Sequence, residues 1–213
     1  MLFLLAVAFD AVLALSSLLL SAIVLSADEA ASVHVEMTTS LGVIEMEIYT
    51  DAAPITATNF MRLVDGSHMD GGSFYRAVSP ENDNGSPIIS VIQGGLGDAE
   101  SPFPPIAHET TADTGLLHVD GAVSMARADV GTASTELFIC IGDQPALDFG
   151  ATRNPDGQGF AVFGRVVRGM DVVNAIHTQP ANTPTESAYM AGQILEEPVA
   201  IISIRRSVLH AEP

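Results

Sequence analysis

The sequence predicts a mainly β protein in which a closed eight-stranded antiparallel β-barrel is capped by two α-helices. The first observation is a set of about eight short segments that are apolar and β-branched, or that alternate between apolar and polar residues. The second is that clusters of Gly, Pro, Asn, Asp and Ser separate these segments. The third is that only two stretches have helical spacing, so helices do not alternate with strands as a parallel α/β sheet requires.

The first elements are predicted to be a β-hairpin and a helix. Apolar and polar residues alternate over 33–37 and again over 43–48, and a glycine-containing turn separates the two runs. A helix is expected over 51–65, because Pro54 suits a first helical turn and apolar residues recur along one face. Gly66 then ends it.

The later elements alternate between strands and long turns. Residues 80–87 are rich in turn-forming residues, and residues 99–121 are expected to be a loop with three prolines near its start. A second short helix is expected over 169–177. The remaining strands are expected at 73–78, 88–93, 122–126, 136–141, 160–167 and 198–206.

The N-terminal segment differs from the rest of the chain. Residues 1–27 are almost wholly apolar, which is typical of a secretory signal peptide or of an uncleaved membrane anchor. No Lys or Arg precedes the apolar run and the cleavage pattern before Ala27 is weak, but the run is long enough to span a bilayer. We therefore expect an exported protein, either periplasmic or secreted, or one tethered to the inner membrane through residues 1–27.

Composition and length indicate one globular domain. We assign 28–32 as a linker, 33–206 as the domain and 207–213 as a tail. Hydrophobic residues make up 47% of the 213 residues, so a core can form. The net charge is -18 and every basic residue is Arg, which argues against nucleic acid as a partner. The one cysteine, Cys140, lies in an apolar run and excludes an intrachain disulfide.

Several short motifs follow one another along the chain. They are Phe74-Tyr75-Arg76, Gln93-Gly94-Gly95, Ser124-Met125-Ala126-Arg127, Glu136-Leu137-Phe138-Ile139 and Phe160-Ala161-Val162-Phe163-Gly164. Their order resembles the cyclophilin family of peptidyl-prolyl cis-trans isomerases, and in particular its bacterial exported branch. The resemblance covers roughly residues 33–206. It implies the family fold, an eight-stranded barrel capped by two helices, and a rotamase activity that needs no metal or cofactor.

Arg76 occupies the position of the family's catalytic arginine. Rotation about an X-Pro bond faces a barrier of ~18–20 kcal/mol, because the amide nitrogen shares its lone pair with the carbonyl. That sharing is lost in the twisted transition state, where the nitrogen can accept a hydrogen bond. A guanidinium aimed at the nitrogen therefore binds the transition state more tightly than either planar state.

The resemblance also implies roles for the residues around Arg76. Gln93 would contact the substrate backbone and help to position the arginine. The expected substrate-binding residues are Phe138 on the floor of a proline pocket, Leu147 in its wall, Met125 close to it, Val91 and Phe160 at further pocket positions, and Arg127 in place of an asparagine that binds substrate backbone.

Some positions differ from the family pattern. Ser90 and Ala146 stand where the family has pocket aromatic residues, and Glu136 replaces a glutamine. These changes leave an alternative open, a non-catalytic module or chaperone that binds proline-containing segments. His108 and Glu109 begin like a zinc-protease signature, but the second histidine is missing, so no metal site is expected. The expected partners are proline-containing polypeptides during the folding of exported proteins, and the expected state is a monomer.

Overall fold

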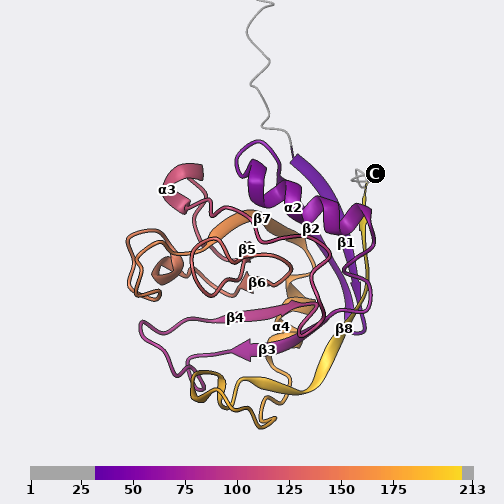
Figure 1. Ribbon diagram of the computed structural model, residues 1–213. Helices are drawn as coiled ribbons and strands as arrows, with labels where there is room; N and C mark the ends of the chain where they lie inside the picture. The colour runs from indigo at the N-terminus through magenta and orange to yellow at the C-terminus, as the bar shows by residue number, and fades with distance from the viewer. Residues whose placement is uncertain (1–31, 208–213) are drawn as a thin grey trace, which may run out of the picture. The chain divides into compact units, whose positions relative to one another are not determined.

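The computed structural model describes residues 32–207, and these residues form a closed β-barrel with the order β1-β2-β7-β5-β6-β4-β3-β8 (Figure 1). All neighbouring strands that are paired run antiparallel, which confirms the predicted fold class. The expected signal or anchor at 1–27, most of the linker and nearly all of the tail lie outside the described residues. The strands are β1 (Ser32–Thr39), β2 (Gly42–Tyr49), β3 (Ser73–Val78), β4 (Val91–Gly95), β5 (Ala122–Met125), β6 (Leu137–Cys140), β7 (Ala161–Arg168) and β8 (Ile194–Arg206).

Two helices pack against the barrel, as predicted. Helix α2 (Pro54–Asp65) contacts β7 and β8, and α4 (Met170–His177) contacts β2, β3 and β4. Three shorter turns lie in stretches that were expected to be loop, because one turn is too short to show a helical period. They are α3 (Thr111–Thr114), η1 (Pro145–Leu147) and η2 (Ala188–Met190). Within residues 32–207, no helix has the length and apolar character needed to cross a bilayer.

Two strands begin three or four residues away from the expected start. β4 starts at Val91 rather than at residue 88, because side chains take the preceding backbone donors: Ile89 N–H binds Asp83 and Ser90 N–H binds Gln144. β8 begins four residues earlier than expected and contains Pro198. A shift in its pairing register lets β8 pair with β3 on both sides of that proline.

The side chains of the strands alternate between two separate apolar clusters. All eight strands contribute to the larger cluster, which fills the barrel and also contains the buried faces of α2 and α4. The smaller cluster lies on the other face of β4, β5, β6 and β7 and includes Phe138 and Cys140. Cys140 is fully buried there, and burial raises the pKa of its thiol. The smaller cluster borders the site described below.

Helix α2 is capped by a residue from a distant loop. Its N-cap residue, Ala53, makes no side-chain hydrogen bond. The buried carboxylate of Glu109 instead accepts hydrogen bonds from the N–H groups of Ile55 (3.0 Å) and Thr56 (2.6 Å) and from the Thr56 hydroxyl (2.7 Å). A negative charge at a helix N-terminus is favourable, since it satisfies free N–H groups and complements the helix dipole.

Replacing Glu109 should therefore destabilise the barrel without touching the site. We expect Glu109→Gln to lower the free energy of unfolding by about 1–2 kcal/mol, because the charge and one acceptor are lost. Urea denaturation measures this difference. The matched control is Glu197→Ala at an exposed position of β8, which should change the free energy by less than about 0.5 kcal/mol. Equal effects of the two variants would contradict the capping role.

Candidate functional site

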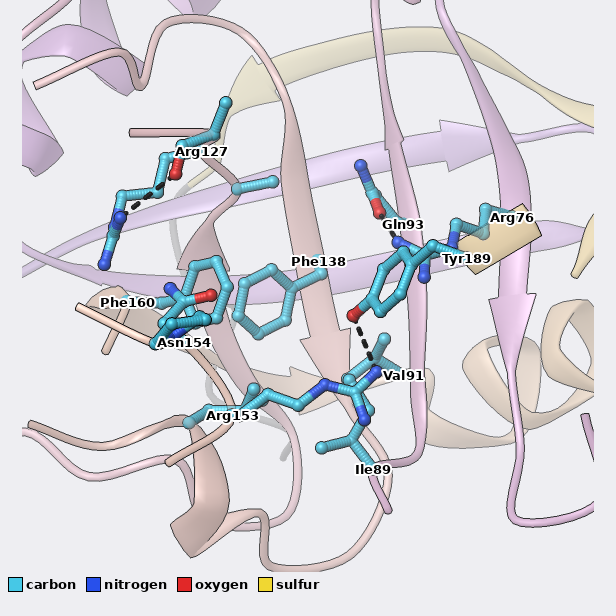
Figure 2. A pocket seen from close by; sticks show the side chains of 14 residues that line it. Arg76, Ile89, Val91, Gln93, Arg127, Phe138, Arg153, Asn154, Phe160 and Tyr189 are labelled. Carbon is cyan, nitrogen blue, oxygen red and sulfur yellow. Dashed lines mark hydrogen bonds between the residues drawn. The ribbon is translucent and has the colours of Figure 1, made fainter. Parts of the chain in front are cut away.

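The main pocket has a volume of about 420 Å³, and Figure 2 shows the side chains that line it. It lies next to the smaller apolar cluster, on the side of β4 and β6 that faces away from the barrel core. Strands β3, β4 and β6 supply its polar side and part of its floor, and loops that follow β5 and precede β4, β7 and β8 supply the rest. It is lined by Arg76, Ile89, Val91, Gln93, Ala126, Arg127, Ala128, Phe138, Leu147, Arg153, Asn154, Pro155, Phe160 and Tyr189.

Strand register aligns three of these residues across neighbouring strands. Arg76 of β3 lies opposite Gln93 of β4, and Gln93 lies opposite Phe138 of β6. An irregularity in the pairing between Phe74 and Arg76 turns the second residue outward, whereas the first stays in the barrel core. Without this bulge, residues two apart in a strand would share a face. The local irregularity therefore places Arg76 in the pocket.

The guanidinium of Arg76 is buried and held by two neutral amides. Its Nε and Nη2 donate to Oε1 of Gln193 at 2.9 and 2.6 Å, and its Nη1 donates to Oε1 of Gln93 at 2.7 Å. These bonds use three of its five N–H donors, so two remain. The residue is only 8% exposed, and burial lowers the pKa of Arg76 from its usual value. Among residues 32–207, no carboxylate lies within ion-pair distance of it.

A directed chain of hydrogen bonds fixes Gln93. Its amide nitrogen donates to the Tyr75 hydroxyl at 3.0 Å, and that hydroxyl donates to Oε2 of Glu136 at 2.7 Å. The second carboxylate oxygen of Glu136 accepts the N–H of Gly97 at 3.0 Å. Burial, together with Glu136, raises the pKa of Tyr75, so the phenol keeps its proton at neutral pH. The amide oxygen of Gln93 must therefore face Arg76.

The apolar side of the pocket is built from residues that the sequence predicted. Phe138, Val91 and Leu147 are buried in the smaller cluster and Phe160 packs on it. The rings of Phe138 and Phe160 meet edge to face, with their centroids 5.2 Å apart. These four side chains form an apolar hollow in the pocket that Arg76 also lines.

A buried Ser-His-Asp arrangement supports the pocket floor. Nδ1 of His118 lies 2.7 Å from Asp148, and its Nε2 lies 3.0 Å from Oγ of Ser124. The order resembles a hydrolytic triad, but His118 is 1% exposed and Ser124 is fully buried, so no substrate reaches them. The imidazole stacks on Phe138 with centroids 5.8 Å apart. It therefore positions the floor and, through Asp148, the adjoining Leu147.

Two expected binding residues have other positions or partners. The prediction for Met125 is wrong: it does not line the pocket but lies in the barrel core at 1% exposure, because the alternation of β5 turns Ser124 outward instead. Arg127 does line the pocket, but its donors bind Asp156, at 2.7 and 3.0 Å, and the carbonyl oxygens of Ala128 and Gly159. This pairing lowers the pKa of Asp156 to about 2.

Neither of the two positions that lack an expected aromatic residue lines the pocket. Ser90 and Ala146 are not among the lining residues, and Ile89 from the loop before β4 contributes to the wall. Ser90 instead places its hydroxyl 3.2 Å from His177. The pocket thus keeps an apolar wall, although aromatic residues are missing at both positions.

Sequence reasoning missed the residues that two loops bring to the site. Gln193 orients Arg76, and Arg153 and Tyr189 line the pocket. Arg153 forms a buried two-bond ion pair with Asp83, at 2.8 and 2.7 Å, which joins the loop after β3 to the loop before β7. The sequence indicated a turn at residues 80–87 and no element in the stretches that hold Arg153, Tyr189 and Gln193, and no local pattern indicates which loops meet in space.

A smaller pocket of about 260 Å³ adjoins the main one. The two share Gln93 and residues 126–128, and the smaller one extends to Glu136 and Ser134. A polypeptide whose proline occupied the main pocket could therefore continue along residues 126–128. Within residues 32–207, no group of three or more His, Cys, Asp or Glu side chains is placed to hold a metal ion.

Sequence comparisons identify known proteins that are similar to this chain. The family model described as cyclophilin-type peptidyl-prolyl cis-trans isomerase/CLD matches residues 34–205. The chain is 34% identical over 194 residues to a peptidyl-prolyl cis-trans isomerase of Acinetobacter baylyi, covering 89% of this chain and 93% of that protein. It is 38% identical over 143 residues to peptidyl-prolyl cis-trans isomerase cyp18 of Streptomyces antibioticus, covering 67% and 81%.

Solved structures show the same fold. A crystal structure of a cyclophilin-type isomerase of Cryptosporidium parvum has a TM-score of 0.60 at 17% identity and covers 86% of this chain and 100% of that one. A second structure of that protein was determined in the presence of the dipeptide Ala-Pro. The resemblance that the motifs indicated is confirmed, and the chain belongs to the family of cyclophilin-type peptidyl-prolyl cis-trans isomerases.

Proposed function

We propose that this isomerase catalyses rotation about X-Pro peptide bonds in the main pocket, where Arg76 faces the prolyl nitrogen. One observation carries this assignment: Arg76 is a buried cation held by neutral amides beside an apolar hollow. A structural arginine would be paired with a carboxylate, as Arg153 is with Asp83. The charge of Arg76 is instead available to a bound substrate.

The mechanism follows from what changes during rotation. The proline ring occupies the hollow lined by Val91, Phe138, Leu147 and Phe160, which excludes water. As the bond twists, the prolyl nitrogen regains its lone pair and accepts a hydrogen bond from a remaining N–H of Arg76. Because the planar states offer no such acceptor, the bond stabilises the transition state selectively. Each tenfold acceleration requires ~1.4 kcal/mol, and a charge-assisted hydrogen bond in a dry site can supply about 1.5–3 kcal/mol.

The remaining residues hold the arginine and the peptide. Gln193 and Gln93 fix the plane of the guanidinium, and the chain through Tyr75 to Glu136 fixes Gln93. Gln93 has one amide N–H left, which we assign to the substrate backbone. The substrate class is a proline-containing polypeptide, which is bound along residues 126–128.

We further propose that the enzyme acts as a monomer on exported polypeptides. The support is the apolar segment at 1–27, which has the composition of an export signal or anchor. Uncatalysed X-Pro isomerisation takes ~10–100 s, so it limits the folding of newly exported chains. An isomerase in that compartment would shorten this step.

Removing the cation should abolish most turnover. We expect Arg76→Ala to lower kcat/KM by about 100-fold or more, which corresponds to about 2.7 kcal/mol of transition-state stabilisation. Exchange NMR on a short Ala-Pro peptide measures cis-trans interconversion directly. The control is Arg165→Ala, which removes a half-exposed arginine paired with Glu47 on the barrel surface. Parent-like turnover of a folded Arg76→Ala variant would exclude the proposed mechanism.

Giving Arg76 a carboxylate partner should also reduce catalysis. In Gln193→Glu, the new charge would face Nε and Nη2, so the field of the guanidinium at the prolyl nitrogen would be largely neutralised. We expect kcat to fall at least about tenfold. The thermal midpoint should not rise, because the carboxylate also replaces the N–H that Gln193 donates to the carbonyl oxygen of Asn82 at 2.8 Å. Asn174→Asp adds the same charge at an exposed position of α4 and serves as the control. Unchanged kcat in Gln193→Glu would show that the unpaired charge is unimportant.

Export can be tested separately in a bacterial host. The full-length protein should appear outside the cytoplasm, whereas a variant that begins at residue 28 should remain inside. Fractionation locates both proteins, and mass spectrometry of the exported form shows whether residues 1–27 are still attached. Cytoplasmic recovery of the full-length protein would refute this part of the proposal.

A further inference from the structure

Tyr189 is an aromatic residue of the pocket that the reaction as described does not use. It belongs to η2, in the segment between α4 and β8, and its side chain lines the main pocket. Figure 2 shows the phenol ring between Arg76 and Arg153. The ring centroid lies 5.2 Å from Cζ of Arg76 and 5.4 Å from Cζ of Arg153, which are cation–π distances.

The phenol is held in place although the residue is 46% exposed. Its hydroxyl oxygen accepts a hydrogen bond of 2.7 Å from Nη2 of Arg153. Arg153 is itself fixed by the ion pair with Asp83, in which the two side chains are 2% and 0% exposed. On the backbone side, the amide of Asn84 donates to the carbonyl oxygens of Tyr189 and Ala191, at 3.2 and 2.8 Å. A tyrosine that only covered a surface would need no such support.

The hydroxyl proton of Tyr189 has no acceptor within residues 32–207. Arg153 can only donate, so the phenol oxygen acts as acceptor in their hydrogen bond and its own proton is left over. A hydroxyl that accepts from a guanidinium becomes a better donor, because hydrogen bonds in a chain polarise one another. A peptide that fills the pocket brings backbone carbonyl groups, each of which is an acceptor.

We propose that Tyr189 is a substrate-binding residue whose hydroxyl donates a hydrogen bond to a backbone carbonyl of the bound peptide. This inference rests on the proposed function of the pocket. Since the ring lies beside Arg76, the carbonyl belongs to the proline or to a residue within one or two positions of it, outside the rotating X-Pro amide, as consecutive Cα atoms are ~3.8 Å apart. The ion pair of Arg153 with Asp83 positions the phenol for this contact.

The role of this bond differs from that of Arg76. A carbonyl outside the rotating amide accepts equally well in the planar and twisted states, so its hydrogen bond stabilises both alike. Losing such an interaction raises KM and leaves kcat nearly unchanged. A tyrosine that served only to position Arg76 would show the opposite behaviour, a fall in kcat.

The test compares Tyr189→Phe with the parent full-length protein by exchange NMR over a range of Ala-Pro peptide concentrations. The variant keeps the ring and removes only the hydroxyl. We expect KM to rise about 3- to 10-fold, while kcat changes less than about twofold. Tyr189→Ala should raise KM at least as much. The matched control is Phe149→Ala, because Phe149 is also 46% exposed but does not line the pocket.

Two results would overturn the inference. One is a Tyr189→Phe variant in which both KM and kcat equal those of the parent. The other is a Tyr189→Phe variant in which KM equals that of the parent and only kcat falls. Arg76→Ala is measured in the same series. If the parent does not accelerate exchange, or if Arg76→Ala keeps its turnover, the proposed function fails. If both behave as expected and Tyr189→Phe has the parent KM, only the role of Tyr189 fails.

Discussion

The buried, unneutralised charge of Arg76 is the constraint on which the site depends. Placing a cation in a protein interior costs several kcal/mol unless polar groups replace its water. Here Gln193 and Gln93 supply the replacement oxygens, and Tyr189 presents its ring to the charge. Each of these groups is neutral, so the charge is solvated without being cancelled. A carboxylate would hold the arginine more firmly and leave less of its field for the substrate.

The barrel also keeps this polar site next to a well-packed interior. Successive residues of each strand point to opposite faces, so β6 sends Leu137 into the barrel and Phe138 into the pocket wall. The bulge in β3 interrupts this rule at one place, where it turns Arg76 outward. The rigid core thereby fixes the row formed by Arg76, Gln93 and Phe138, which lies across three hydrogen-bonded strands.

Most of the fold could be predicted from sequence because periodicity and turn residues are local signals. The order of the motifs also predicted Arg76, Gln93 and Phe138 as site residues, and all three line the main pocket. The errors have physical causes. Met125 was assigned to the pocket by motif position alone, although the alternation of β5 buries it in the barrel. Gln193, Arg153 and Tyr189 could not be found, since their roles come from contacts between loops far apart in sequence. Pro198 concealed the start of β8, because a proline inside a strand normally argues against pairing.

The pocket combines two kinds of structure with different tolerance to change. The row that includes Arg76 is set by strand register, whereas the opposite lip comes from loops joined by the Arg153–Asp83 ion pair, with residues 188–193 fastened to them. Loops accept insertions that strands do not. Apart from Gln193, which holds Arg76, and Tyr189, the lip can therefore be lengthened, shortened or recharged during evolution while the chemistry stays intact. One barrel could in this way serve client sets of very different surface character, and selectivity could be redesigned in the loops alone.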